Sequence, residues 1–321
     1  MTFDTAANLA PSQPSALAQH IEAARTYAAA AKADATRRAY AGDVERWRAW
    51  AEAHGAQVLP AQPEAVAVYL AHLASEGRKV ATIERALAGI ASASRAAGSW
   101  TRGHAAIGAV MAGIKRTHGI APQRKAALEV PQLRALVASL DVATLSGLRD
   151  RAVLLVGWFG AFRRSELAHL EVGDVQFVNE GIEVRLKRSK TDKNGAGAVR
   201  GLPYAGDAAC CPVRALRAYL EATGIENGAL FRSINRHGQV GDSLSDKSIA
   251  RIVQGAAERA GLDATTFGGH SLRAGFATAA ARQGRSLDAI MRQTGHRSER
   301  VARGYIRHAT LFTNNAAAGL L

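Results

Sequence analysis

Apolar side chains recur every three or four residues along most of the first 118 positions, which is the period of an amphipathic helix. Between residues 35 and 54 the repeat consists of Tyr40, Val44, Trp47 and Ala51, and Gly55 follows as a stop signal. We predict one all-helical domain, residues 15–118, behind a flexible tail at residues 1–14 that is rich in small and polar residues. Its five helices are expected at residues 16–32, 35–54, from Pro63 onward, 80–97 and 104–115.

A second domain is predicted at residues 128–321, after a linker at residues 119–127 that lacks apolar periodicity. It begins with helical patterns, and the one at residues 148–161 is apolar enough to predict a buried helix. The period then changes to alternation, which is typical of strands. Strands are expected at residues 175–177, 182–186 and 199–203, and helices from Pro212 to the end. The predicted fold class is mainly α, with an all-helical N-terminal domain and a mixed α+β domain whose helices accompany a small antiparallel sheet.

Side chains that can bind phosphate are concentrated in residues 267–308. His270 and Arg273 are three residues apart, so a helix presents both from one face. His296 and Tyr305 follow in the same stretch. Arginine binds phosphate through two parallel hydrogen bonds, and histidine can transfer a proton near neutral pH. A tyrosine beside a bound phosphate is a candidate nucleophile. Two of the short helices that hold these residues are expected at residues 286–295 and from Ser298 onward.

The charge of the chain indicates what it binds. Its 321 residues carry a formal net charge of +14, and apolar residues make up 48% of them, enough for a core in each domain. This surplus favours a polyanionic partner, a nucleic acid first and an acidic membrane second, although a solvated basic surface accounts for part of the arginine. No apolar run is long enough to span a membrane and no signal-peptide pattern is present, so we expect a cytoplasmic protein without a membrane partner.

The sequence contains no pattern typical of a metal site. Its two cysteines, Cys210 and Cys211, are adjacent and match no zinc spacing, which favours buried side chains near the start of a helix. No cluster of Asp and Glu of the metal-binding type lies near the phosphate-binding stretch.

Basic residues are concentrated where helices of the first domain begin. Helix N-termini bind phosphate, and helices enter the major groove, so these residues are candidates for DNA contacts. A solvated helix face explains any one of them at least as well. The candidates are Arg37, Arg38, Arg78, Lys79, Thr82 and Arg85.

A charged cluster directly follows the predicted buried helix. Arg163 is costly there unless it is paired or binds an anion, and Glu166, three residues along, could hold its guanidinium. Lys190 lies at the tip of a strand pair. Taken alone, an Arg–Glu pair is usually structural and a hairpin lysine is usually solvated.

Together these residues form five motifs in a fixed order. They are GAFRRSEL with Arg163, RSKT with Lys190, HSLR with His270 and Arg273, TGH with His296, and GYIRH with Tyr305, nine residues after that histidine. Any single motif is weak evidence, whereas five in order are specific. Over residues 15–321 the chain resembles the tyrosine recombinases of the phage integrase family, in particular the Cre-like members.

The resemblance implies the tyrosine recombinase catalytic fold and assigns roles by position. Tyr305 would attack a backbone phosphate, giving a 3′-phosphotyrosyl link and a free 5′-hydroxyl. Arg163 and Arg273 would bind the nonbridging oxygens and stabilise the transition state. In the remaining roles, Lys190 would protonate the 5′-oxygen, His270 would accept the tyrosine proton, His296 would hydrogen-bond the phosphate and Glu166 would orient Arg163. Lys187 and Lys193 are alternatives to Lys190.

The resemblance also implies the partners and the overall activity. The partner would be double-stranded DNA with inverted half-sites, bound by one dimer per site and by a tetramer in the synapse, and the chemistry would need neither metal nor ATP. The apolar C-terminal segment with Leu320 and Leu321 would dock onto the neighbouring subunit, or pack against its own domain. The implied function is site-specific DNA recombination. Relaxation of DNA in the manner of a type IB topoisomerase, and DNA binding by an inactive regulator, are the alternatives.

Overall fold

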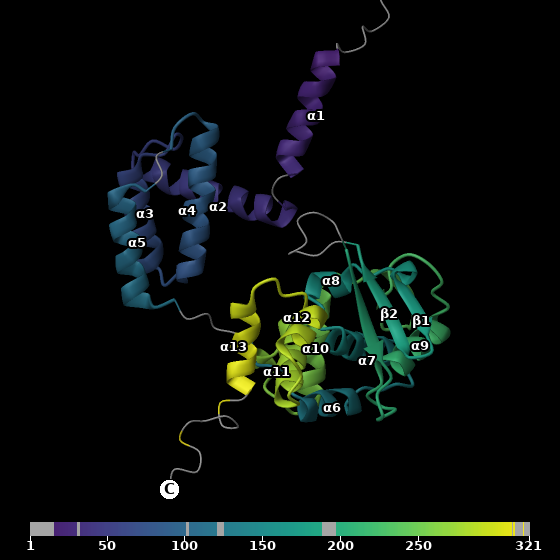
Figure 1. Cartoon of the computed structure of the whole chain (residues 1–321). Coiled ribbons are helices and arrows are strands. Elements are labelled where there is room, and N and C mark those ends of the chain that lie inside the picture. Colours follow the sequence, from purple (N-terminus) through teal and green to yellow (C-terminus); the bar gives the residue numbers. More distant parts are fainter. Residues whose placement is uncertain are drawn as a thin grey trace, which may run out of the picture. The chain divides into compact units, whose positions relative to one another are not determined.

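The chain divides into two compact units, Met1–Pro122 and Gln123–Leu321, each with its own apolar core (Figure 1). Each unit is therefore described by itself. The predicted tail at residues 1–14, and Lys190, Leu320 and Leu321, lie outside the described residues. The computed structural model describes residues 16–30, 33–100, 103–120, 125–187, 197–309, 311 and 317.

The first unit is helical. Its elements agree in order and approximate bounds with the helices that the periodicity predicts. Helices α2 to α5 share one core, whereas the side chains described on α1 are exposed. The helices are α1 (Ala16–Ala30), α2 (Asp34–Ala53), α3 (Pro63–Ser75), α4 (Val80–Ala96) and α5 (Ala105–His118).

Trp47 of α2 lies at the centre of this core. Its indole is fully buried, its ring centre is 5.3 Å from that of Tyr69, and its Nε1–H donates to Val58 O at 2.8 Å. One position on α2 differs from the predicted apolar face, because Asp43 is buried where Val44 was expected. A carboxylate is tolerated there because guanidinium groups hydrogen-bond to it.

The second unit contains the remaining elements, and its helices surround α7, which is buried along most of its length as its apolar sequence predicts. The helices are α6 (Val130–Ala138), α7 (Leu145–Phe159), α8 (Arg164–Ala168), α9 (Pro212–Thr223), α10 (Asp246–Arg259), α11 (Gly269–Arg282), α12 (Leu287–Thr294) and α13 (Glu299–Ala309), with short 3₁₀ turns η1 (Val172–Asp174) and η2 (Ala264–Thr266).

A close backbone contact fixes α11 to the start of this unit. A Cβ on Gly275 would lie 1.9 Å from Leu128 O, so only glycine fits at that position. Leu128 O accepts a hydrogen bond from Trp158 Nε1 at 3.0 Å, and Leu128 N donates to Ser271 O at 3.0 Å. Leu128 thereby joins α7 to α11, the helix that carries the HSLR motif.

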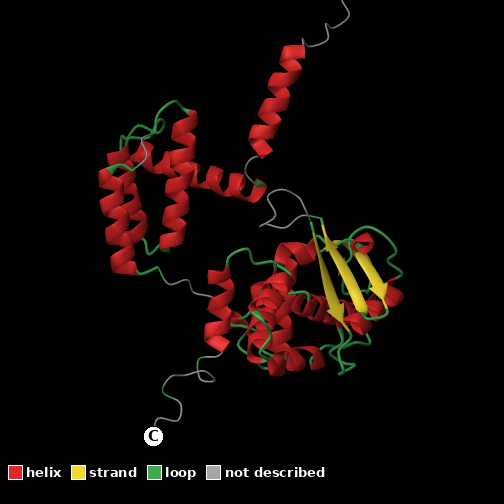
Figure 2. Cartoon of the chain, in the orientation of Figure 1, coloured by secondary structure: helices red, strands yellow, loops and turns green. Residues whose placement is uncertain are grey.

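A three-stranded antiparallel sheet lies beside these helices (Figure 2). It consists of β1 (Val175–Val178), β2 (Gly181–Leu186) and β3 (Ala198–Pro203), the three strands that the alternation predicts, and they pair in the order β1-β2-β3. Exposed and buried positions alternate along β3, and the buried ones are Leu202 and, unexpectedly for a charged residue, Arg200.

The prediction that the chain is helical from Pro212 to its end is wrong. β4 (Arg232–Ile234) and β5 (Val240–Ser243) form a two-stranded antiparallel sheet between α9 and α10. The side chain of Asn235 closes their turn by accepting hydrogen bonds from the N–H groups of His237 and Gln239 at 2.9 and 3.0 Å. These strands are short and largely polar, so they show no alternation of apolar residues that would distinguish them from the helical segments on either side.

The cysteines lie where the sequence predicts. Cys211 is fully buried in the position preceding α9, Cys210 is half-buried, and both are free thiols. In the part of the chain that the structure describes, no three His, Cys, Asp or Glu side chains are grouped as metal ligands. None of the described helices combines the length and the apolar character needed to cross a membrane.

Candidate active site

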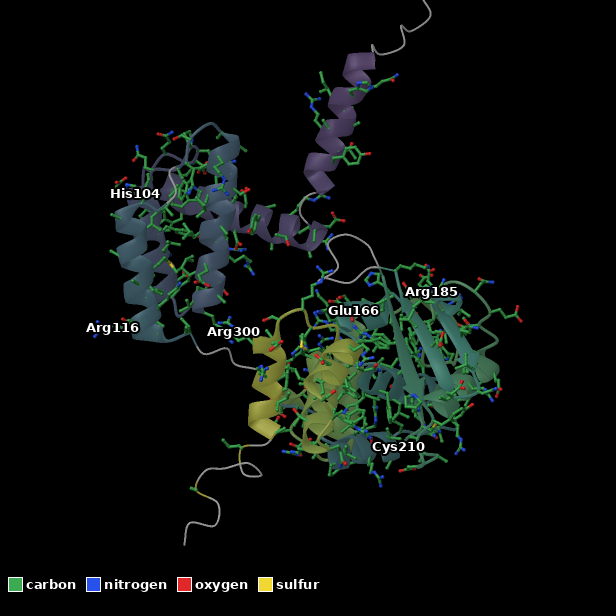
Figure 3. All side chains as sticks on the ribbon, viewed as in Figure 1. His104, Arg116, Glu166, Arg185, Cys210 and Arg300 are labelled. Atoms are coloured by element: carbon green, nitrogen blue, oxygen red, sulfur yellow. The ribbon has the colours of Figure 1, made fainter. Side chains whose placement is uncertain are left out.

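Arg163 immediately precedes α8, in the turn that follows α7. Its backbone N–H donates to Glu166 Oε2 at 2.9 Å, and its Nη1 donates to Glu166 Oε1 at 2.5 Å. Glu166, labelled in Figure 3, is 7% exposed, so its carboxylate is largely shielded from water. The contact between the two residues has the i to i+3 spacing noted in the sequence, and it holds the guanidinium in one orientation.

The turn before Arg163 has a strained backbone. Ala161 has a φ of +46°, in the left-handed region that residues with a Cβ rarely adopt, at a cost of about 1–2 kcal/mol. The carbonyl of Ala161 accepts a hydrogen bond from Arg273 Nη1 at 2.8 Å, and that of Gly160 accepts one from Arg200 Nη1 at 2.7 Å. The guanidinium groups of Arg273, on α11, and Arg200, on β3, therefore both hold this turn.

Arg273 is the fifth residue of α11 and is 1% exposed. Its Nη2 is buried and has no hydrogen-bond partner among the described residues. Buried donors in native proteins are nearly always paired. The orphaned N–H group therefore indicates a ligand that brings an acceptor, and an anion suits a guanidinium best.

His296 is positioned by the end of α12. Ser286 caps the start of that helix by accepting from Ala289 N at 3.2 Å, and Gly295 ends it with a φ of +64°. Thr294 Oγ1 lies 2.8 Å from His296 Nδ1. This hydrogen bond fixes the imidazole and leaves Nε2 as the ring nitrogen that can meet a ligand.

Tyr305 belongs to α13, which packs on α11 and α12 (Figure 1). Its Oη lies 3.1 Å from His270 Nε2, and its ring stacks on His296 with 5.8 Å between ring centres. α13 is attached through a small apolar cluster separate from the main core, made of Ala277, Ala281, Ile290 and Ala309. The phenol and both imidazoles of the sequence-predicted set thus meet at one place.

The electrostatics of the site disfavour additional positive charge. Burial lowers the pKa of Arg273 to about 10, together with the neighbouring charges of Arg163 and Arg200. Burial also lowers the pKa of His296 to about 4, again with the help of nearby arginines, Arg273 first. His296 is consequently neutral at neutral pH, and the site favours the arrival of an anion.

Two residues of the site receive no role from the sequence motifs: Arg200 lies outside all five, and Thr294 begins the TGH motif but is not singled out by it. Arg200 approaches Glu166 and the end of α12 from β3, and Thr294 holds the His296 ring. A signal for Arg200 exists, because it occupies the inward position two residues before Leu202 in a predicted strand. Thr294 is part of TGH, but a threonine at a helix end is common and does not by itself indicate a contact with the histidine.

The lysine of the predicted set is the one member that the structure does not place. Lys190 and its alternative Lys193 lie outside the described residues, whereas Lys187 is described. Lys187 Nζ lies 2.5 Å from Glu171 and 3.2 Å from Asp174. Its hydrogen bonds to Glu171 and then to Asp174 raise the pKa of Lys187.

The candidates for DNA contact belong to the first unit, away from these residues in the sequence. Arg78, Thr82 and Arg85 line a depression of about 490 Å³ together with Arg46. Beneath it, Asp43 is 1% exposed and accepts from Arg85 Nε at 2.8 Å, so the carboxylate holds the guanidinium in place. The other three candidates are Arg37, which pairs with Asp34, Arg38, which is exposed, and Lys79, which precedes α4.

Buried arginines, two imidazoles and a tyrosine in one site define an enzyme that acts on a phosphate ester. Residues 127–311 match the phage integrase family, and residues 20–97 match the phage integrase N-terminal SAM-like domain. The chain therefore belongs to the phage integrase family of tyrosine recombinases. The fold class predicted from the sequence is confirmed by these matches and by the solved structures below.

Two curated relatives extend over nearly the whole chain. The integrase/recombinase xerD homolog of Selenomonas ruminantium is 40% identical over 290 residues, which cover 89% of this chain and 85% of the relative. The recombinase cre of Escherichia phage P1 is 26% identical over 284 residues, covering 82% and 80%.

Solved structures share the fold at lower identity. A lambda integrase tetramer bound to a Holliday junction has a TM-score of 0.58 at 18% identity, covering 89% of this chain and 76% of that one. The XerH recombinase in a post-cleavage complex with its palindromic difH substrate has a TM-score of 0.57 at 20% identity, covering 76% and 69%.

Proposed function

We propose that this protein is a site-specific DNA recombinase that cleaves and rejoins duplex DNA through Tyr305. The observation that carries the proposal is the 3.1 Å separation of Tyr305 Oη and His270 Nε2, beside a buried Arg273 whose Nη2 has no acceptor among the described residues. A nucleophile in contact with a base, next to a donor directed at an incoming anion, is what transfer of a phosphoryl group to tyrosine requires.

In the cleavage step the Tyr305 oxygen attacks the phosphorus of a backbone phosphodiester, and the bond from phosphorus to the 5′-oxygen breaks. The phenolic proton passes to His270 Nε2, and a lysine gives a proton to the departing 5′-oxygen. The DNA is left with a 3′-phosphotyrosyl bond and a free 5′-hydroxyl. Attack by the 5′-hydroxyl of a second strand reverses the step and releases Tyr305. One ester replaces another throughout, so the reaction needs no ATP.

The charges of the site support this step. Two guanidinium groups, those of Arg163 and Arg200, pair with the single carboxylate of Glu166, whose negative charge also acts on the nearby Arg273. Arg163 and Arg273 are in our proposal the groups that bind the nonbridging oxygens, where negative charge increases in the transition state. His296 is neutral, and because Thr294 Oγ1 lies 2.8 Å from its Nδ1, the Nε2 edge of the ring is in our proposal the one that meets the phosphate.

The general acid is proposed to be Lys190. Lys187 is the alternative that the contacts argue against, because its ammonium is engaged by Glu171 and Asp174 and its pKa is raised. A general acid must release its proton readily, so a raised pKa is unfavourable. The match of RSKT to the family motif supports Lys190 over Lys193.

The first unit is proposed to bind DNA as a core-binding domain, residues 15–118, joined by the 119–127 linker to a catalytic domain at residues 128–321. Arg78, Thr82 and Arg85 would contact the duplex from the depression that they line, and Arg37, Arg38 and Lys79 from the starts of α2 and α4. The match of residues 20–97 to an integrase N-terminal domain favours recombination over simple DNA relaxation.

The assembly is proposed to follow that of the family. One dimer would bind inverted half-sites and two dimers would form a tetrameric synapse, as in the lambda integrase tetramer on a Holliday junction. The C-terminal segment with Leu320 and Leu321 would dock onto the neighbouring subunit. We place the protein in the cytoplasm, where bacterial and phage DNA is accessible.

The proposal is tested by covalent trapping. Duplexes that bind the full-length protein are first selected from random DNA, and a nicked version of the selected duplex is then incubated with the protein and resolved in denaturing gels. The wild type and the Tyr204→Phe control, an exposed tyrosine of the same unit, should give a covalent adduct. Tyr305→Phe should bind the same DNA with unchanged affinity and give none. An adduct that survives in Tyr305→Phe contradicts the assignment, and binding without any adduct in the wild type contradicts the enzymatic function.

A further inference from the structure

Arg200 is a buried, charged side chain that the reaction described above does not use. It is 3% exposed, and it occupies an inward position of β3 where the strand pattern favours an apolar residue. Burial lowers the pKa of Arg200. A guanidinium in such a place costs free energy unless its hydrogen bonds are satisfied.

The hydrogen bonds of Arg200 reach three segments that are distant in the sequence. Nη1 donates to Gly160 O at 2.7 Å, in the turn before Arg163. Nη2 donates at 3.4 Å both to Glu166 Oε2 and to Thr294 O. The guanidinium also lies 4.9 Å from the centre of the Phe162 ring, a distance that allows a cation–π contact.

Each of these acceptors adjoins a residue of the proposed reaction. Gly160 is followed by Ala161, whose carbonyl holds Arg273. Glu166 holds Arg163. Thr294 bonds to His296 through its hydroxyl. One side chain thus contacts the supports of the arginine turn and of the TGH turn at the same time.

The position of Arg200 argues against a direct role at the phosphate. Its buried Nε has no hydrogen-bond partner among the described residues, but both of its terminal nitrogens are bonded to protein oxygens, and the side chain is 2% exposed. A Cβ on Gly295 would lie 3.1 Å from Arg200 Nη2, so the turn that leads to His296 packs directly on the guanidinium. An apolar side chain of similar volume would fill the space, but would leave the Glu166 and Thr294 oxygens without this donor.

We propose that Arg200 is a positioning residue, which fixes the placement of Arg163 relative to His296 for strand cleavage. The inference rests on the proposed function, because it concerns the geometry of that reaction. Unlike the motif residues that contact the phosphate in our proposal, Arg200 acts only through Glu166, the Gly160–Ala161 turn and Thr294.

The test compares full-length Arg200→Met and Arg200→Lys with the wild type, using the nicked duplex obtained by selection. Arg185→Met is the matched control, since Arg185 is an exposed arginine on the neighbouring strand β2 (Figure 3). At saturating DNA, Arg200→Met should slow adduct formation by about tenfold to a hundredfold, the loss expected when catalytic groups are misplaced by a fraction of an ångström to one ångström. The dissociation constant for DNA should stay within about twofold, and Arg200→Lys should recover part of the rate because its ammonium still donates to one or two of the acceptors.

A double-mutant comparison separates positioning from an independent effect. If Arg200 acts through Glu166, the loss in Arg200→Met/Glu166→Gln should be smaller than the product of the single losses. Adduct formation by Arg200→Met within about twofold of the wild type would overturn the proposal, as would fully multiplicative losses. If Arg200→Met does not fold, as judged by circular dichroism, Arg200→Lys carries the comparison.

A second measurement is independent of DNA cleavage. The imidazole NMR signals of His296, assigned with His296→Asn, should move in Arg200→Met and stay in place in Arg185→Met. If the wild type gives no adduct, the proposed function fails while this measurement still decides whether Arg200 positions His296. Unchanged His296 signals in Arg200→Met would refute the positioning role.

Discussion

The low pKa of His296 makes a quantitative prediction about acid stability. In an unfolded chain a histidine titrates near 6.5, whereas burial and the positive charges of Arg273 and Arg163 lower the pKa of His296 to about 4. The folded state therefore binds this proton more weakly than the unfolded state does. The neutral ring is compatible with the fold above pH 6.5, and stability is progressively lost as the pH falls from 6.5 towards 4.

The size of the effect follows from the pKa difference. At about 1.4 kcal/mol per pKa unit, the fall from 6.5 to about 4 sets an upper bound of about 2.5 kcal/mol lost between pH 7.5 and 4.5. Because the His296 ring is only half-buried, solvent screening reduces this loss to about 1–1.5 kcal/mol. His296→Asn removes the titrating group while keeping a polar atom near Thr294. The wild type should thus lose about 1–1.5 kcal/mol more than His296→Asn over this interval.

The assay is urea-induced unfolding at pH 7.5, 6.5, 5.5 and 4.5, with the free energy of unfolding of the second unit extracted at each pH. His237→Asn is the control, because His237 lies exposed in the β4–β5 turn of the same unit. The control should follow the wild type. A stability difference between wild type and His296→Asn that stays constant from pH 7.5 to 4.5 would refute the electrostatic account of this site.

Three further predictions concern other parts of the molecule. Thr294→Val removes the hydroxyl that holds His296 Nδ1 at 2.8 Å and should slow adduct formation at saturating DNA by about tenfold or more, with unchanged DNA affinity; wild-type kinetics would show that the bond is dispensable. Lys190→Met should slow adduct formation by about 10²- to 10⁴-fold. Lys187→Met should leave the rate nearly unchanged, because Lys187 is engaged by Glu171 and Asp174, and the reverse ranking would assign the general acid to Lys187. Asp43→Asn should lower the free energy of unfolding of the first unit by about 1.5–3 kcal/mol in urea, and it should weaken DNA binding because Arg85 is released. Lower stability with unchanged DNA affinity would remove Arg85 from the proposed interface.

The sequence predicts those features of this protein that repeat locally. The helices of the first unit follow from apolar spacing, as Trp47 and Ala51 on one buried face of α2 illustrate. The strands β1 to β3 follow from alternation. The residues around Tyr305 are recognisable because each motif is short and contiguous, so that His270 and Arg273 can be found without knowledge of the fold.

Features that depend on distant contacts are not predictable in this way. Arg200 meets Thr294 across 94 residues and Arg273 meets Ala161 across 112, and no local pattern encodes either contact. The β4–β5 hairpin is missed because a few polar residues carry little periodicity. Asp43 is missed as a buried position because its burial depends on Arg85, which lies 42 residues away.

The attachment of α13 has a consequence for when Tyr305 is available. The buried members of the cluster beneath this helix are three alanines and one isoleucine, with Ala280, Tyr305 and Ile306 packed against them, and the cluster is separate from the large core around α7. Detachment of α13 therefore exposes less apolar surface than opening of the large core, so its local opening costs less free energy than unfolding of the unit. Amide protons of α13 should exchange with solvent faster than those of α11, so that the nucleophile is carried by a helix that can open while the main core stays folded.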